Sequence, residues 1–307
     1  MILTVTLNTS VDMRFVVHDF QPGGVFRAME DQQTAGGKGL NVTRVLKQLQ
    51  APVLATGLVG GKNGEFIQEQ LDGLGINHSF VSVQGNTRVC IAVLDGDVQT
   101  EVLGRGPRIA KDELERFFQE FQRLAQQAKI VCISGSIPPS VPDTVYADMV
   151  ELAWRCGCKV ILDSSGPALA KALSAQPFLV KPNEDELRAL VGRELNSQED
   201  IVLAMKDIAG RGVEVVVVSQ GAKGALVHAA GRVYSVKAPQ VKAVNPVGSG
   251  DAMVAGFAHG IHGDWELERT LAWAAACGVA NAMEAQTGYV QPDNVQRLLE
   301  AVEVEKY

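Results

Sequence analysis

Short, continuously apolar runs alternate along this chain with stretches of helical periodicity, and this alternation limits the possible folds more than any other feature. The apolar runs are residues 2–7, 53–58, 130–133, 160–162, 178–180 and 215–218. Strands that are apolar at every position are typical of a parallel sheet covered on both faces. Between the runs, Val42, Val45, Leu46 and Leu49 form one helical stripe, and residues 112–127, 143–155 and 199–209 behave similarly. The order predicts an α/β fold with a mostly parallel sheet and right-handed crossovers.

Two regions interrupt this order with extended segments that no helix separates. They are residues 13–17 with 26–34, and residues 88–94 with 98–103, the second pair being joined by the hairpin-forming sequence Asp95-Gly96-Asp97. Residues 88–94 are apolar on both faces: Val89, Ile91 and Val93 lie on one, and Cys90, Ala92 and Leu94 on the other. Such an edge hairpin needs a cover on each side, so we expect a ligand site on one side and a partner chain on the other.

Composition excludes several classes of protein. The chain has 307 residues, of which 46% are hydrophobic and 21% charged, as in ordinary globular proteins. Its 35 acidic and 28 basic residues give a net charge of −7, which argues against nucleic-acid binding. No apolar run approaches the roughly 18 residues of a membrane span. The first residues resemble a strand and lack a basic leader, and the five cysteines are scattered, so we expect a cytoplasmic protein without a disulfide framework.

Three glycine clusters precede helices or follow a strand, where exposed backbone amides can bind anions. They span residues 35–41, 219–224 and 245–251. None fits a Walker A loop, because Gln32 stands where its first glycine would be, and none fits Gly-x-Gly-x-x-Gly, because Met253 stands at the last position. P-loop NTPases and dinucleotide enzymes are therefore disfavoured.

The third cluster places a carboxylate beside an anion site. Asp251 follows Gly248-Ser249-Gly250 in the first turn of an expected helix. Backbone amides that bind a phosphoryl group, next to a carboxylate, suit a base that deprotonates an attacking hydroxyl. The alternative is that Asp251 only caps the helix, a common role for Asp.

Seven motifs occur in the order found in one family. They are Asn8-Thr9-Ser10-Val11-Asp12, Gly36-Gly37-Lys38-Gly39-x-Asn41, Ser134-Gly135-Ser136-x-Pro138, Asp163-x-Ser165-Gly166, Lys181-Pro182-Asn183-x-x-Glu186, Ser219-x-Gly221-x-x-Gly224 and Gly248-Ser249-Gly250-Asp251. With them, the chain resembles the ribokinase-like sugar kinases of the phosphofructokinase B family from Ile2 to about Leu299. The resemblance implies a three-layer α/β/α sandwich over residues 1–307 with a small β-sheet lid, its strands inserted at about 13–34 and 88–103.

Within this family, residues 34–46, 55–61 and 245–251 are most similar to the tagatose-6-phosphate kinases. The sequence departs from the family pattern at Thr9, where proline is usual, and at Asn245, where many members have Asp. The second departure puts potassium dependence in doubt. The alternatives are a 1-phosphofructokinase, a minor-type 6-phosphofructokinase, and a non-catalytic protein that senses sugars or nucleotides.

The resemblance assigns roles residue by residue. It makes Asp251 the general base, with Gly248, Ser249 and Gly250 as the anion hole. It assigns a sugar-phosphate substrate to Asp12, Arg27, Gly36, Gly37, Lys38, Asn41, Arg88 and Ser136. It assigns ATP to Lys181, Asn183, Glu186, Ser219, Gly221, Gly224, Ala275 and Asn281. Glu186 would help to hold Mg²⁺, partly through water. The lid sheet is expected to pair with that of a second subunit in a homodimer.

Overall fold

The central sheet confirms the parallel α/β architecture expected from the apolar runs. The structure is a computed structural model that describes residues 1–96 and 98–307. The sheet has ten strands in the order β14-β13-β12-β11-β10-β9-β8-β1-β4-β5. The parallel strands are β1 (Ile2–Thr6), β4 (Val53–Val59), β5 (Asn77–Ser82), β8 (Ile130–Ser134), β9 (Lys159–Asp163), β10 (Leu179–Val180) and β11 (Val215–Ser219). An antiparallel extension follows, with β12 (Ala225–Ala229), β13 (Arg232–Lys237) and β14 (Glu303–Lys306).

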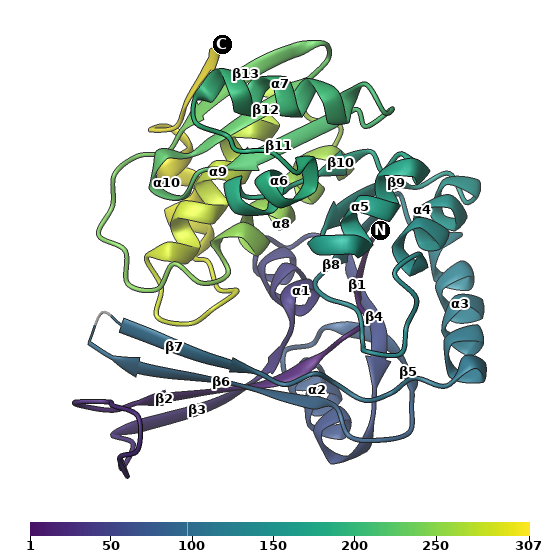
Figure 1. The fold of residues 1–307 in the computed structure, drawn as a ribbon, viewed down its shortest axis with the longest axis vertical. Coiled ribbons are helices and arrows are strands. Elements are labelled where there is room, and N and C mark those ends of the chain that lie inside the picture. The colour runs from purple at the N-terminus through teal and green to yellow at the C-terminus, as the bar shows by residue number, and fades with distance from the viewer. Residues whose placement is uncertain (97) are drawn as a thin grey trace.

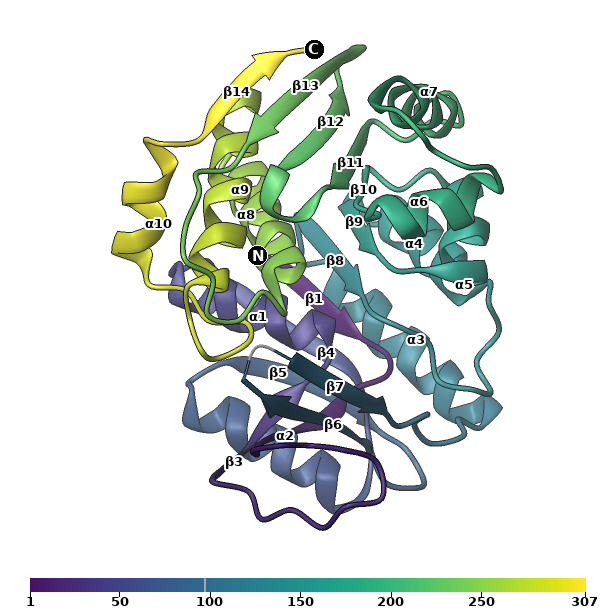
Figure 2. The same ribbon diagram turned by 60° about the vertical axis from the view of Figure 1, so that its left-hand side comes forward.

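Helices cover both faces of this sheet, which gives the expected three layers (Figure 2). One layer contains α1 (Lys38–Gln48), α8 (Ser249–His262), α9 (Leu267–Ala282) and α10 (Pro292–Leu299). The other contains α3 (Lys111–Ala125), α4 (Val145–Arg155), α5 (Gly166–Ala172), α6 (Glu184–Val191) and α7 (Gln198–Ala209). Within β11, Val215 and Val217 pack in the first layer's core, whereas Val216 and Val218 pack in the second. This burial on both faces is the physical reason for the apolar runs.

A second, smaller sheet extends from one end of the molecule (Figure 1). We call it the lid sheet. Its strands are β2 (Ser10–Val16), β3 (Glu30–Gly36), β6 (Arg88–Asp95) and β7 (Val98–Leu103), in the order β3-β2-β6-β7. Strands β2 and β6 pair in parallel and the outer pairs are antiparallel. Helix α2 (Gly61–Gly73) packs beside its inner end, in a core shared with Val11 and Ala35.

The boundaries of the lid strands differ from those expected. Strand β2 begins at Ser10 rather than at residue 13, and β3 spans 30–36 rather than 26–34. Residues 17–29 form an irregular loop, because Pro22-Gly23-Gly24 favours a turn over strand pairing. The hairpin turn between β6 and β7 was expected at residues 95–97, of which Asp97 lies outside the described residues. In the part of the chain that is described, no helix is long and apolar enough to cross a membrane.

Candidate active site

A cavity of about 610 Å³ lies between the carboxyl ends of the central strands and the lid sheet. Its floor includes residues at or just after the carboxyl ends of β1, β8, β9, β10 and β11, as expected for a ligand site in an open α/β sheet. Its other wall is the inner face of the lid sheet. All seven sequence motifs, far apart in the chain, therefore meet at one place.

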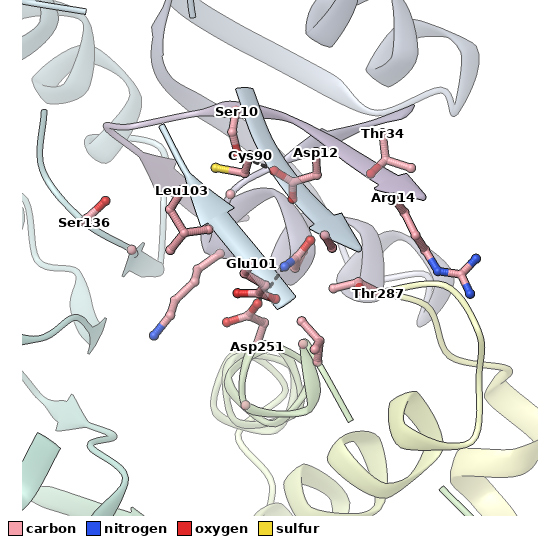
Figure 3. A pocket seen from close by; sticks show the side chains of 18 of the residues that line it. Ser10, Asp12, Arg14, Thr34, Cys90, Glu101, Leu103, Ser136, Asp251 and Thr287 are labelled. Carbon is pink, nitrogen blue, oxygen red and sulfur yellow. Dashed lines mark hydrogen bonds between the residues drawn. The ribbon is translucent and has the colours of Figure 1, made fainter. Parts of the chain in front are cut away.

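Asp251 lines this cavity from the first turn of α8 (Figure 3). Its carboxylate is buried, and its Oδ2 accepts a hydrogen bond of 2.7 Å from Nδ2 of Asn41. The helix begins after Gly248, whose φ of 84° is in the left-handed region. A Cβ on Gly248 would lie 2.7 Å from Cγ2 of Thr287, so this position requires glycine. The geometry gives a carboxylate beside the N-terminal amides of α8, of which the Ser249 amide already donates to the Pro246 carbonyl oxygen at 3.2 Å.

The environment of Asp251 raises its pKa to about 6. Burial is the main cause, and the negative charge of Asp163 adds to it. Lys38, the Asn41 amide and Lys181 act in the opposite direction because they stabilise the ionised carboxylate. A carboxyl group with this pKa is ionised at neutral pH but holds a proton more readily than an exposed Asp, as a general base requires.

Two lysines and two further carboxylates form a charged cluster next to Asp251. Nζ of Lys181 lies 3.4 Å from Oδ1 of Asp163, and Nζ of Lys38 lies 3.7 Å from the same oxygen. Lys38 is also 3.9 Å from Oε1 of Glu186, and these acids raise the pKa of its ammonium. Lys38 was expected to hold the sugar phosphate, but here its ammonium lies with residues expected to bind ATP.

The two motifs expected to bind ATP, residues 181–186 and 219–224, lie next to this cluster, and a helix cap holds the first of them in place. Asn183 caps α6: its side chain accepts from the Glu186 amide at 2.8 Å, and Glu186 Oε2 accepts from the Asn183 amide at 2.9 Å. Ser219, at the end of β11, bridges to Asn183 and lines the same part of the cavity. The two lysines beside it can bind phosphate groups.

The inner face of the lid sheet contributes the opposite wall (Figure 3). Ser10 Oγ donates to Oδ1 of Asp12 at 2.6 Å, which orients that carboxylate toward the cavity. A Cβ on Gly36 would lie 2.0 Å from Cγ of Asp12, so glycine is required beside it. Arg88 donates to the carbonyls of Asn8 and Gly104 and also lines the cavity.

Most of the residues expected in the site line this cavity. Those that do are Asp12, Gly37, Lys38, Asn41, Arg88, Ser136, Lys181, Asn183, Glu186, Ser219, Gly248, Gly250 and Asp251. Gly36 and Ser249 do not line the cavity themselves, but they are next in sequence to the lining residues Gly37, Gly248 and Gly250. Arg27 is exposed in the loop 17–29 and does not line the cavity.

Four residues expected at the nucleotide lie away from the lining. Gly221 and Gly224 form the turn between β11 and β12, where a Cβ on Gly224 would lie 2.0 Å from the Val236 carbonyl oxygen. Ala275 is in the core of α9. Asn281 is fully buried, donates to the Val247 carbonyl at 2.9 Å and accepts from the Gly288 amide at 2.9 Å, so it shapes the loop before α8.

Sequence reasoning assigned no role to three residues that the site contains. Asp163 follows the apolar run 160–162, and its place at a strand's carboxyl end was the available signal. Asn8 donates to Ser136 Oγ at 3.2 Å and belongs to a motif that was recognised only as a landmark. Arg44 is buried behind Asn41, and no sequence pattern indicated this.

The donor set fits a divalent metal that is held mainly by a nucleotide. Within residues 1–96 and 98–307, no three His, Cys, Asp or Glu side chains are arranged to hold a metal ion by themselves. Both oxygens of Asp163 are buried without a hydrogen-bond partner among the described residues, and Glu186 lies on the same side of the cavity. Mg²⁺ commonly keeps several waters and uses one or two carboxylates plus substrate phosphates, which matches this arrangement.

Comparison with known proteins agrees with this geometry. The sequence profile described as pfkB family carbohydrate kinase matches residues 4–294. A protein provisionally named phosphofructokinase from Staphylococcus aureus is 32% identical, with a TM-score of 0.86, and the match covers 100% of this chain and 99% of that one. Phosphofructokinase-2 from Escherichia coli, in a complex with fructose-6-phosphate, is 29% identical with a TM-score of 0.89 and 98% of each chain covered.

A third structure, provisionally named 1-phosphofructokinase, comes from Thermotoga maritima. It is 29% identical with a TM-score of 0.89, and the match covers 100% of this chain and 99% of that one. The fold is the ribokinase-like fold that the resemblance implied. Because the family profile spans nearly the whole sequence, the chain belongs to the pfkB family of carbohydrate kinases.

Proposed function

We propose that this ATP-dependent sugar kinase phosphorylates a ketohexose phosphate, with D-tagatose 6-phosphate giving D-tagatose 1,6-bisphosphate as the first choice. The observation that carries the proposal is the position of Asp251, a buried carboxylate between the lid wall and the lysine cluster. A sugar hydroxyl at this point could meet the base on one side and a phosphoryl group on the other.

The reaction follows from this arrangement. Asp251 accepts the proton of the sugar hydroxyl as its oxygen attacks the terminal phosphorus of ATP. The bond between that phosphorus and the ADP oxygen breaks, and ADP leaves. The amides of Gly248 and Gly250 and the two lysines stabilise the negative charge on the transferring group, whereas the Ser249 amide donates to the Pro246 carbonyl oxygen. Asp251 then releases the proton to solvent.

One side of the cavity would bind the sugar phosphate and the other would bind ATP. Asp12, Gly36, Gly37 and Asn41 would bind sugar hydroxyls, while Arg88 and Ser136 would bind the phosphate that the sugar already carries. Lys181, Asn183, Glu186 and Ser219 would bind the nucleotide phosphates. Lys38 lies close to the Asp163 and Glu186 carboxylates, which favours a role at the transferring phosphoryl group over one at the sugar phosphate.

Mg²⁺ would lie beside Glu186 and Asp163, and it would neutralise phosphate charge and orient the ATP phosphates. Two observations support this placement: the Asp163 oxygens have no hydrogen-bond partner among the described residues, and the Asn183 amide holds the Glu186 carboxylate in place.

The choice of sugar rests on the sequence motifs, because residues 34–46, 55–61 and 245–251 are most similar to tagatose-6-phosphate kinases. The named relatives favour two alternatives, fructose 6-phosphate and fructose 1-phosphate. ADP release should be measured with ATP and Mg²⁺ against all three sugars. The proposal predicts the highest kcat/KM for tagatose 6-phosphate, and a higher value for either fructose phosphate would replace it. Absence of turnover with any sugar would favour a sensing protein.

We also propose that the lid sheet pairs with a second copy of the chain. Its outer face carries Phe15, Ile91 and Val93, with Val98 and Val102 more than three-fifths exposed. An apolar face of this kind needs a cover, and identical chains usually associate with two-fold symmetry. Arg27, near the end of this sheet, would act on the sugar phosphate in the closed assembly.

A further inference from the structure

Arg44 is a buried cation that makes no direct ion pair in the described part of the chain. It lies in α1, is 6% exposed, and has no carboxylate among its contacts. Taking an arginine out of water without a counter-ion is strongly unfavourable. Since its charge persists at any physiological pH, the surroundings must compensate for this burial.

Three acceptors surround the guanidinium, and each comes from a different part of the active site. One nitrogen donates to the carbonyl oxygen of Ala35 at the end of lid strand β3. The other donates to Oδ1 of Asn41 and, at 3.2 Å, to the carbonyl oxygen of Thr287. Arg44 therefore joins the lid sheet, helix α1 and the loop that follows α9.

The contact with Asn41 determines which way that amide faces. A guanidinium only donates hydrogen bonds, so the atom it contacts must be the amide oxygen. The Asn41 nitrogen then faces Asp251, to which it donates at 2.7 Å. If the amide were reversed, its oxygen would face the carboxylate and its NH2 group would face the guanidinium, and both contacts would be repulsive.

The loop that contains Thr287 packs over the side chains of Asn41 and Arg44. Gly288 has a φ of 67°, and a Cβ there would lie 3.0 Å from Cα of Asn41 and 3.1 Å from a terminal nitrogen of Arg44. The backbone therefore packs directly over the pair. Burial lowers the pKa of Arg44, and the nearby negative charges of Asp12 and Asp251 oppose this lowering. They serve as its counter-charges without touching it.

We propose that Arg44 is a positioning residue for phosphoryl transfer: it holds the Asn41 amide with its nitrogen toward Asp251 and ties the lid strand and the Thr287 loop around that pair. This inference rests on the proposed role of Asp251 as the base. It does not depend on which sugar is the substrate, because the contacts of Arg44 lie behind the base. The test therefore uses whichever sugar phosphate the unmodified enzyme turns over fastest.

The charged and polar groups around Asp251 determine its pKa, and with it the pH at which kcat falls on acidification. They are Asp163 from β9, Lys38 and Asn41 from α1, and Lys181 after β10, with Asp12 of β2 and Arg44 farther away. Removing Arg44 takes away a positive charge and frees the Asn41 amide to reverse. Both changes make the ionised base less stable, so the acidic limb of the kcat–pH profile should move to higher pH.

The experiment compares Arg44→Met, Asn41→Ala and the double variant, with Arg44→Lys as a second variant and Thr43→Val as a control. Thr43 is also fully buried in α1, but its hydroxyl contacts Thr4 and the Gly39 carbonyl, outside this network. Misplacement of the reacting groups should lower kcat of Arg44→Met on the order of 10- to 100-fold, with the acidic limb moved upward. On the Asn41→Ala background, the same change should lower kcat less than about threefold.

Arg44→Lys keeps the positive charge, so it should retain more activity than Arg44→Met and shift the acidic limb of the kcat–pH profile less. If Arg44→Met does not fold, Arg44→Lys serves as the test in its place. The proposal is overturned if the limb stays in place in the variants of Arg44. It is also overturned if the effects of Arg44→Met and Asn41→Ala on kcat multiply, or if Thr43→Val loses as much activity at an equal loss of thermal stability. No turnover by the unmodified enzyme with any sugar phosphate would instead contradict the proposed function.

Discussion

Nζ of Lys181 lies 3.4 Å from Oδ1 of Asp163, and both side chains are almost completely buried at the floor of the cavity. The same carboxylate oxygen lies 3.7 Å from Nζ of Lys38. One buried acid therefore holds two lysines on the side of the cavity away from the lid. The lysines are oriented before any phosphate arrives, which lowers the entropy loss on binding.

Replacing Asp251 with Asn should remove nearly all turnover while leaving ATP binding intact. Loss of a general base lowers a rate by about 10²- to 10⁴-fold, and Asn keeps the size of the side chain. Steady-state kinetics give the loss in kcat, and isothermal titration calorimetry gives the affinity for ATP. Activity within a few-fold of the unmodified enzyme would show that another group takes the proton.

The same substitution should raise the melting temperature at pH 8. The pKa of Asp251 is about 6 in the folded protein, above its ordinary value of 3.8, so folding takes up a proton between these values. Below pH 3.8 the group does not oppose folding, and its destabilising effect grows as the pH rises through about 6. The melting temperatures of the two proteins should therefore approach each other toward pH 4. If the difference in melting temperature between the unmodified protein and Asp251→Asn stayed constant from pH 4 to pH 8, the raised pKa of Asp251 would be contradicted.

Activity should fall on acidification with an apparent pKa near 6 in kcat/KM, because the base must be ionised in the free enzyme. Lys38→Met should move this limb to higher pH, because Lys38 stabilises the Asp251 carboxylate. Lys111→Met is a matched control, since that lysine is exposed and pairs only with Glu115 among the described residues. The same apparent pKa of the acidic limb in the unmodified enzyme, Lys38→Met and Lys111→Met would show that Lys38 does not stabilise the Asp251 carboxylate.

Arg88→Ala should raise the KM for the sugar phosphate about tenfold or more and leave the KM for ATP nearly unchanged. A charge-assisted hydrogen bond to phosphate contributes about 1.5–3 kcal/mol, which corresponds to this factor. Arg27→Ala should act in the same direction only if the lid closes over the substrate. Both values come from initial rates with one substrate varied. An effect of Arg88→Ala on ATP alone would place the sugar phosphate elsewhere.

Charges placed on the two faces of β6 should have different effects. Val93→Asp on the outer face should dissociate the proposed dimer, because a desolvated carboxylate opposes burial of that face. Ala92→Asp, on the face that lines the cavity, should weaken sugar binding and leave the assembly unchanged. Light scattering coupled to size exclusion reports the mass, and kinetics report the binding. A monomeric unmodified protein at all working concentrations would exclude the dimer.

The sequence predicted the central sheet well, because strands buried on both faces must be apolar throughout. It did not indicate β5, β12, β13 or β14. Strands β5 and β14 are edge strands whose sequences, such as Glu303–Lys306, are mostly polar, and β12 and β13 form an antiparallel extension outside the repeated strand–helix order. Among site residues, Asp251 and Asn41 were found through motifs. Arg44 could not be found, because its burial depends on Thr287, a contact between residues 243 positions apart. An arginine beside a helical apolar stripe looks like a surface residue until that loop is placed.

The parallel pairing of β2 with β6 also determines the order in which the chain can fold. Ser10 aligns with Arg88, and β3, α1, β4, α2 and β5 all lie between them in sequence. A parallel pair cannot close through a tight turn, and closing so long a loop is entropically unfavourable until the intervening segments are compact. We therefore expect the inner strands of the lid to meet late, after the neighbouring part of the central sheet has formed. The wall proposed to bind the sugar would thus be completed only on a body that is already folded, and we expect a half-folded chain to lack this site.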